Sequence, residues 1–72
     1  MTAAQIRKRL TWQGIRLFLG ELQVGSITFM GPFCFGNYSY GRAGIGNGSD
    51  QKEIMKLVED AVVKSILTKL DE

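Results

Sequence analysis

The chain has 72 residues, of which 44% are apolar and 22% are charged, so the composition excludes a disordered polar chain and allows one domain with a modest core. One cysteine and no histidine exclude an intrachain disulfide and remove the commonest general base and the commonest metal ligand. The net charge of +2 is too small by itself to indicate binding to nucleic acid or to an anionic membrane.

The first element predicted along the chain is a short helix over residues 2–10. Thr2 and Gln5 have the spacing of a capping box, in which the threonine hydroxyl accepts a backbone hydrogen bond and the glutamine reaches back. Ile6 and Leu10 would then share one apolar face. A helix of this length is not stable alone, so we expect it to dock on the rest of the domain.

A change to a period of two residues predicts strands from Trp12 onward. Ile15, Leu17 and Leu19 recur at every second position, as in a strand with one buried side. Gly20-Glu21 then fits a two-residue hairpin turn that begins with glycine.

The second predicted strand covers residues 22–29 and changes phase in its middle. A bulge at Gly25-Ser26 would restore the register without exposing the apolar set. Two continuations are open. The chain turns at Gly31-Pro32 into a third strand over residues 33–40, or it runs on and turns at Gly36-Asn37. The second continuation places a proline inside a strand, where it cannot donate to the ladder, so we favour the first.

A glycine-rich stretch over residues 41–48 predicts a flexible connection to a long helix. Asp50 as N-cap and Glu53 would form a capping box, and both acids suit the positive end of the helix dipole. One apolar stripe of this helix would cover a face of the sheet; it consists of Ile54, Leu57, Val58, Ala61 and Val62.

A second apolar cluster on the same helix is rotated away from the first; it consists of Val63, Ile66, Leu67 and Leu70. Either the N-terminal helix or a sheet edge covers this cluster, or the cluster is a surface for a partner. In the second case a homodimer through the C-terminal helix is expected.

Together these elements predict a single α+β domain over residues 1–72. A short N-terminal helix (2–10) precedes a three-stranded antiparallel β-meander within residues 12–43. A glycine-rich loop (44–49) then leads to a long C-terminal helix (50–70) packed on one sheet face.

The sequence offers no set of residues suited to catalysis. Cys34 lies between Phe33 and Phe35 and has no histidine to activate it, which is typical of a small core residue. Glu59 and Asp60 are adjacent on a helix and point about 100° apart. We therefore predict no catalytic, cofactor-binding or metal-ligating residue, no cofactor and no enzymatic activity.

The order helix, three strands, helix resembles that of double-stranded-RNA-binding domains. In that family a glycine-bearing turn precedes a helix whose N-terminal lysines straddle major-groove phosphates, and Gly46-Asn-Gly48 followed by Asp50-Gln51-Lys52 stands at this place. The chain departs from the family in having one lysine where two or three are expected, with Asp50 beside it. The tight Gly20-Glu21 turn also replaces the longer loop between the first two strands. The resemblance implies binding of duplex RNA.

The charge distribution supports the same alternative function. Residues 1–49 carry five basic residues and one acidic residue (5 − 1 = +4), whereas residues 50–72 carry four basic and six acidic residues (4 − 6 = −2). Nucleic-acid binding would use phosphate contacts from Arg7, Lys8, Arg9, Arg16, Arg42 and Lys52.

In size and style the chain also resembles small orphan proteins of phages and other mobile elements, including anti-CRISPR and similar host-defence inhibitors. This resemblance rests on no motif and transfers no residues. We predict a non-enzymatic protein that occupies the surface of a protein partner as an inhibitor, an adaptor or a self-assembling subunit. The absence of a secretion signal and of an apolar run of about 18 residues predicts a cytoplasmic location and no membrane partner. The expected contact residues are Phe33, Phe35, Tyr38, Tyr40, Arg42, Val63, Ile66, Leu67 and Leu70.

Overall fold

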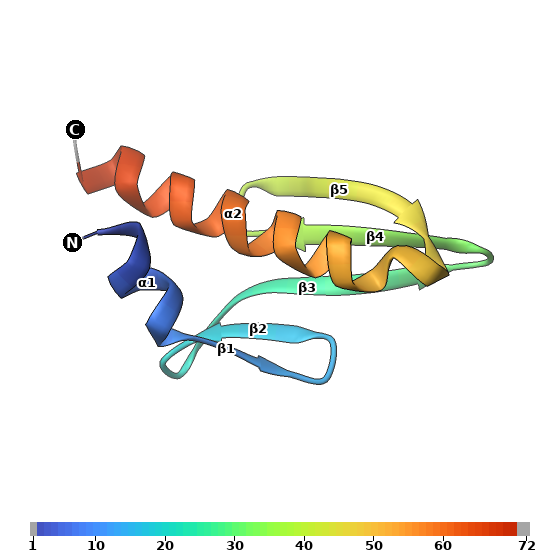
Figure 1. Ribbon diagram of the computed structural model, residues 1–72, viewed down its shortest axis with the longest axis horizontal. Helices are drawn as coiled ribbons and strands as arrows, with labels where there is room; N and C mark the ends of the chain where they lie inside the picture. Colours follow the sequence, from blue (N-terminus) through green and yellow to red (C-terminus); the bar gives the residue numbers. More distant parts are fainter. Residues whose placement is uncertain (1, 71–72) are drawn as a thin grey trace.

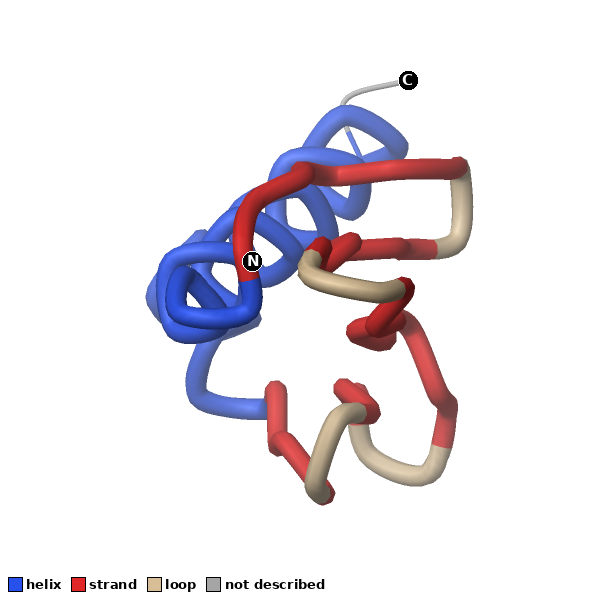
Figure 2. The backbone as a smooth tube through the Cα atoms, turned by 90° about the vertical axis from the view of Figure 1, so that its right-hand side faces the viewer, coloured by secondary structure: helices blue, strands red, loops and turns tan. Residues whose placement is uncertain are grey.

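The computed structural model describes residues 2–70, apart from the side chain of Leu70. One antiparallel sheet of five strands, in the order β1-β2-β3-β4-β5, carries both helices on the same side (Figure 1). Figure 2, viewed roughly along the strands, shows that the sheet is strongly curved. In chain order the elements are α1 (Ala3–Arg9), β1 (Leu10–Gln13), β2 (Arg16–Leu19), β3 (Leu22–Met30), β4 (Phe33–Tyr38), β5 (Gly41–Asn47), a 3₁₀ turn η1 (Gly48–Asp50) and α2 (Gln51–Leu70).

The α+β class, both helices and two of the hairpin turns are confirmed. The capping box of α1 is present, because the Gln5 N–H donates to Thr2 Oγ1 at 3.2 Å and the Thr2 N–H donates to Gln5 Oε1 at 2.9 Å. The chain turns at Gly20-Glu21 between β2 and β3, and at Gly31-Pro32 between β3 and β4. The first of the two continuations considered for the middle of the chain is therefore correct.

The prediction of three strands is wrong, since the sheet has five. Gly14, with φ of +64°, begins a turn that separates β1 from β2, and Ile15 in that turn is exposed instead of joining the buried row. The residues predicted as a flexible connection form β5, which pairs with β4 from Gly41 to Asn47 with one register shift at Ala43.

Four glycines on the covered side of the sheet explain why a glycine-rich segment forms a strand; they are Gly25, Gly36, Gly44 and Gly46. A Cβ atom on Gly36 would lie 2.7 Å from Val58 Cγ2, and one on Gly44 would lie 2.7 Å from Leu57 Cδ1. The helix α2 therefore lies directly on the backbone of the sheet. Packing against the helix compensates for the low intrinsic preference of glycine for strands.

The bulge that restores the phase of β3 lies next to the predicted position. The pairing of β2 with β3 changes register between Leu17 and Phe18, whose partners are Gly25 and Gln23, and this leaves Val24 as the extra residue. The predicted bulge was at Gly25-Ser26, one residue further on. Val24 is buried in the core.

The core lies between the sheet and α2 and consists of Leu17, Val24, Ile27, Cys34, Ile54, Val58 and Val62. The helix α1 packs beside the C-terminal half of α2 (Figure 1), and Ile6 of α1 is fully buried. Val63 is only 4% exposed and Ile66 packs against the core. Coverage by neighbouring elements, the first of the two explanations given above for the second apolar cluster, therefore applies to these two residues.

Polar contacts join α1, β1 and α2. Trp12 Nε1 donates a hydrogen bond to Glu59 Oε1 at 2.9 Å. The Arg7 guanidinium pairs with Asp60 and lies 3.9 Å from Glu59 Oε2. These contacts fix the first hairpin and the N-terminal helix against the long helix. Over residues 2–70, neither helix combines the length and the apolar character needed to span a membrane.

Candidate functional site: the open face of the sheet

The side of the sheet opposite α2 is here called the open face, and within residues 2–70 no helix covers it (Figure 1). Successive side chains of a strand point to opposite sides. In β4, Cys34 is fully buried and Gly36 lies against α2. The residues that alternate with them, Phe33 and Phe35, therefore point to the open face. The register places Met30 opposite Phe33 and Ile45 opposite Phe35.

These four residues form an apolar patch on the open face: Met30, Phe33, Phe35 and Ile45. Met30 is 65% exposed, Ile45 is 54% exposed and Phe33 is 49% exposed, whereas Phe35 is half-buried. The covered side of β4 and β5 carries mainly glycine and cysteine, with Tyr38 at the end of β4. The phenylalanine and isoleucine side chains of these strands lie on the uncovered side. A contiguous exposed patch of this kind is typical of an interaction surface.

Arg42 lies at the border of the apolar patch. Its Cζ atom is 4.7 Å from the centroid of the Phe35 ring, within the range of a cation–π interaction. Next to it, Asn37 Nδ2 donates a hydrogen bond to Thr28 Oγ1 at 3.0 Å. These residues and Met30 line a shallow hollow of about 220 Å³, so the patch has a polar border that can orient a partner.

A polar row crosses all five strands beside the apolar patch and consists of Gln13, Arg16, Ser26, Asn37 and Arg42. Arg16 and Arg42 are the two charged side chains of the five strands, and no strand carries an acidic residue. The charge on the strands of this face is therefore positive.

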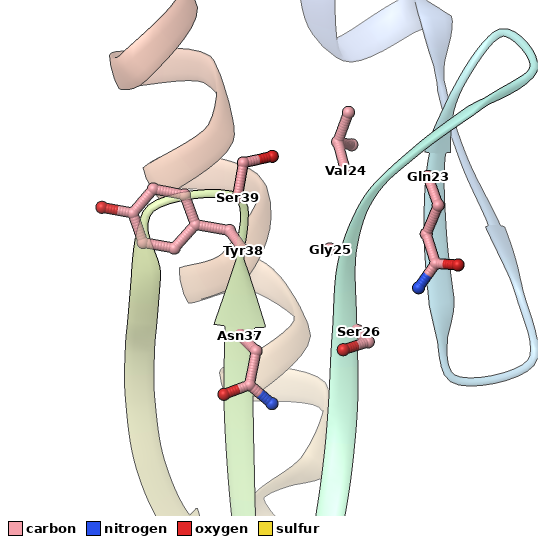
Figure 3. A pocket seen from close by; sticks show the side chains of 7 residues that line it. All are labelled: Gln23, Val24, Gly25, Ser26, Asn37, Tyr38 and Ser39. Atoms are coloured by element: carbon pink, nitrogen blue, oxygen red, sulfur yellow. The ribbon is translucent and has the colours of Figure 1, made fainter.

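A second hollow opens where β3 and β4 separate. Their ladder ends at the pair Gly25–Tyr38, and beyond it a hollow of about 330 Å³ is lined by Gln23, Val24, Gly25, Ser26, Asn37, Tyr38 and Ser39. Figure 3 shows this hollow with α2 behind the strands and with Asn37 and Ser26 on neighbouring strands. Among the residues that the structure describes, none with a carboxylate, imidazole, thiol or ammonium group lines it. Its side chains offer hydrogen bonds and apolar contact, but no acid–base chemistry.

The residues of β4 and β5 predicted to contact a protein partner do not all lie on the same side of the sheet. Phe33, Phe35 and Arg42 lie together on the open face. Tyr38 lies on the covered side and packs against the core. Tyr40, in the turn before β5, meets Tyr38 edge to face at 6.0 Å between ring centroids.

The second apolar cluster offers little free surface. Val63 is buried and is not available as a contact residue, because α1 packs against this part of α2. Ile66 and Leu67 are half-buried. The side chain of Leu70 lies outside the described residues.

The basic residues predicted for nucleic-acid binding do not form one surface. Arg16 and Arg42 are on the open face, whereas Arg7–Arg9 belong to α1 and Lys52 belongs to α2, on the other side of the sheet. Arg7 is also paired with acidic side chains.

The residues with catalytic potential lie in structural positions. Cys34 is fully buried, Glu59 accepts from Trp12, and Asp60 pairs with Arg7. Within residues 2–70, no three His, Cys, Asp or Glu side chains gather closely enough to hold a metal ion.

The sequence reasoning missed Met30 and Ile45 as members of this surface. The signal for Ile45 was the run Gly44-Ile45-Gly46, in which a large residue alternates with glycine as in a strand that faces a close neighbour. Comparison with protein-family models, with curated proteins and with solved structures finds no match for this chain.

Proposed function

We propose that this protein is a non-enzymatic binding protein that occupies the surface of a protein partner with its open face, as an inhibitor or adaptor of the phage or mobile-element type. The observation that carries the proposal is the inverted distribution of side chains on β4 and β5. Phenylalanine and isoleucine lie on the uncovered side and glycine on the covered side. Burying such residues on a partner gains roughly 25 cal/mol per Å² of apolar area.

The composition of the patch favours a protein partner. Aromatic residues, methionine and arginine are enriched in the centres of protein interfaces, and the patch with Arg42 contains all three kinds. Arg42 is held against the Phe35 ring, so less of its side-chain freedom remains to be lost on binding. Substitution of Phe33, an exposed aromatic residue of the patch, is expected to weaken binding at least about tenfold, equivalent to about 1.4 kcal/mol.

The test compares two variants that each replace an exposed apolar residue with serine, on different sides of the sheet. Phe33→Ser changes the open face. Leu22→Ser changes a residue that is 66% exposed but pairs with Leu19 on the other side of the sheet. Immobilised wild type, Phe33→Ser and Leu22→Ser capture proteins from the source cells, and calorimetry then measures affinity for the purified partner. The partner should bind the wild type and Leu22→Ser equally. Equal affinity for Phe33→Ser would refute the open face as the binding surface.

Single-stranded nucleic acid is the second candidate for the same face. Arg16 and Arg42, without any acidic residue on the strands, share the open face with the exposed Phe33 ring. This matches the combination of backbone charge contacts and base stacking that such sites use. In this case the affinity for an RNA or DNA oligonucleotide should fall steeply with salt. Arg42→Gln should reduce the slope of log K against log salt by about one. A protein partner bound with weak salt dependence would exclude this candidate.

A further inference from the structure

The outer strand β5 exposes main-chain hydrogen-bonding groups at the edge of the sheet. The register pairs Cys34 with Gly46, and further along the Gly48 N–H donates to the Pro32 carbonyl oxygen at 3.1 Å. Bonded and non-bonded pairs alternate in an antiparallel ladder. The main-chain groups of Gly46 therefore face β4, and those of Ile45 point away from the sheet.

One end of this free edge is closed by the protein itself. The Asn47 N–H, which also points outward by the same alternation, donates to Asp50 Oδ2 at 3.2 Å. Among residues 2–70, no hydrogen bond outside the sheet and helix ladders involves Ile45. The N–H and carbonyl of Ile45 are therefore the central groups that the edge offers to another strand.

Apolar side chains flank this edge on both sides of the sheet. Leu57 of α2 lies against Gly44 and is 43% exposed, and Ile45 is exposed on the open face. Natural sheets protect their edges with lysine, proline, inward-pointing charge or very short strands. The seven residues of β5 include no lysine, proline or acidic residue. A β-bulge can also protect an edge, but the register shift of β5 lies at Ala43 and leaves residues 44–46 regularly paired with β4. This edge has the features of a pairing site.

We propose that β5 pairs antiparallel with β5 of a second copy of the chain, around a two-fold axis at Ile45. The two Ile45 residues would exchange both of their outward hydrogen bonds, and their β-branched side chains would meet on the open face. Glycine lies opposite glycine on the covered side, because Gly44 of one copy faces Gly46 of the other. On the covered side the two strands carry only glycine between the Leu57 residues, and the Asp50 side chain over each Gly46 borders this contact.

The charges of the strand fit this arrangement. The pairing brings the end of β5 that carries Arg42 beside the end of the other β5 at which Asp50 caps Asn47. Opposite charges therefore lie at both ends, with Arg42 on the open face and Asp50 over Gly46 on the covered side. The two Arg42 residues are about six residues, or roughly 20 Å, apart along the paired strands. This distance exceeds the Debye length of about 8 Å at physiological salt, so their repulsion is screened. A reversed copy of the same strand is therefore a complementary partner.

The pairing would join two sheets into one and place the two apolar patches side by side. It does not depend on the identity of any partner for the open face, because it uses main-chain groups of the chain alone. A dimer could therefore form if no protein bound the patch, and a monomer could still bind one.

The experiment measures self-association and amide exchange on the purified full chain. Sedimentation equilibrium is expected to show the mass rising from 8.0 kDa towards twice that value between about 10 μM and about 1 mM, the range of a weak small interface. Over the same range, hydrogen exchange by NMR should slow at least about tenfold at the Ile45 N–H. The Gly46 N–H, which faces β4, serves as the internal control and should be protected at both concentrations.

Two variants test the role of the main-chain donor. Ile45→Pro removes the outward N–H and should remain monomeric, whereas Ile45→Val keeps it and should dimerise. Far-UV circular dichroism checks that each is folded, and the exchange measurement on the wild type decides the matter if Ile45→Pro does not fold. A wild-type chain that is monomeric at about 1 mM would overturn the proposal. A dimer in which the Ile45 N–H exchanges as fast as in the monomer would overturn it equally.

Discussion

Gly36 lies in β4 against α2, and replacing it with alanine tests whether the glycines set the distance between helix and sheet. The added Cβ atom would lie 2.7 Å from Val58 Cγ2 and 2.8 Å from Ile54 Cγ2. Both are branch methyl groups of buried side chains, and a β-branched residue in a helix has little freedom to change its χ1 angle. The helix would therefore have to move.

Gly44→Ala is the matched control. Its Cβ atom would come as close, 2.7 Å, but to the terminal Cδ1 of Leu57. That side chain is partly exposed and can rotate away. Neither Gly36 nor Gly44 has a positive φ, so alanine fits the backbone at both positions and the two variants differ mainly in packing.

The expected difference follows from two opposing effects. Overpacking a core costs about 1–3 kcal/mol, and replacing glycine with alanine gains about 0.4–1 kcal/mol by restricting the unfolded chain. Gly36→Ala should therefore lower the free energy of unfolding by about 1–2 kcal/mol. The melting temperature should fall by roughly 4–16 °C in a domain of this size. Gly44→Ala should stay within about 0.5 kcal/mol of the wild type.

Urea unfolding, followed by far-UV circular dichroism, measures the free energy of unfolding of both variants. The slope m should stay constant, because a changed slope would indicate a changed unfolded or native state. If Gly36→Ala were as stable as Gly44→Ala, the close approach of α2 to the backbone would not limit the sheet. The explanation given above for the glycine-rich strand would then be wrong.

Three further predictions concern other parts of the fold. Trp12→Phe removes the hydrogen bond to Glu59 and should lower the free energy of unfolding by about 1–2 kcal/mol in urea titrations; an unchanged midpoint would mean that the contact does not stabilise the fold. Arg7→Ala breaks exposed ion pairs and should cost less than about 1 kcal/mol. That cost should disappear near 1 M salt, and a larger loss that is independent of salt would contradict this. Cys34 is fully buried, so a thiol reagent should react with it at least about 100-fold more slowly in the native protein than in denaturant. Rapid reaction of the native protein would show that the thiol is accessible.

The elements that could be predicted from sequence are those fixed by neighbours a few residues away. The capping box of Thr2 and Gln5 and the turns at Gly20-Glu21 and Gly31-Pro32 depend on local backbone geometry. The long helix α2 was likewise indicated by its apolar period. For these elements the residues that decide the structure lie next to one another in the chain.

The elements that could not be predicted depend on contacts with distant residues. In β5, Gly44 and Gly46 look like a flexible loop until α2 is placed over them, because Leu57 and Ile54 supply the packing that the glycines lack. The turn at Gly14-Ile15 was hidden by an apolar residue that continues the alternation of Leu17 and Leu19.

The candidate site was predicted in part, and for a related reason. Phe33, Phe35 and Arg42 were expected contact residues, but a period of two does not reveal which side of a strand a helix covers. Cys34 and Gly36 decide it, since α2 lies on them and leaves no room there for large side chains. Met30 and Ile45 could be placed on the open face only when the register with β4 was known.

The same packing connects the fold to the proposed function. Because α2 lies directly on glycine, the covered side of β4 and β5 has no space for phenylalanine or isoleucine, and these side chains occupy the other side. Fully burying one such side chain is worth about 1.5–3 kcal/mol, and a small domain is stable by only about 5–15 kcal/mol. Leaving Met30, Phe33 and Ile45 between 49% and 65% exposed therefore forgoes a substantial fraction of the possible stability. A partner that covers the patch would recover this free energy as binding energy. For that reason substitutions on the open face should reduce affinity much more than they reduce the stability of the free chain.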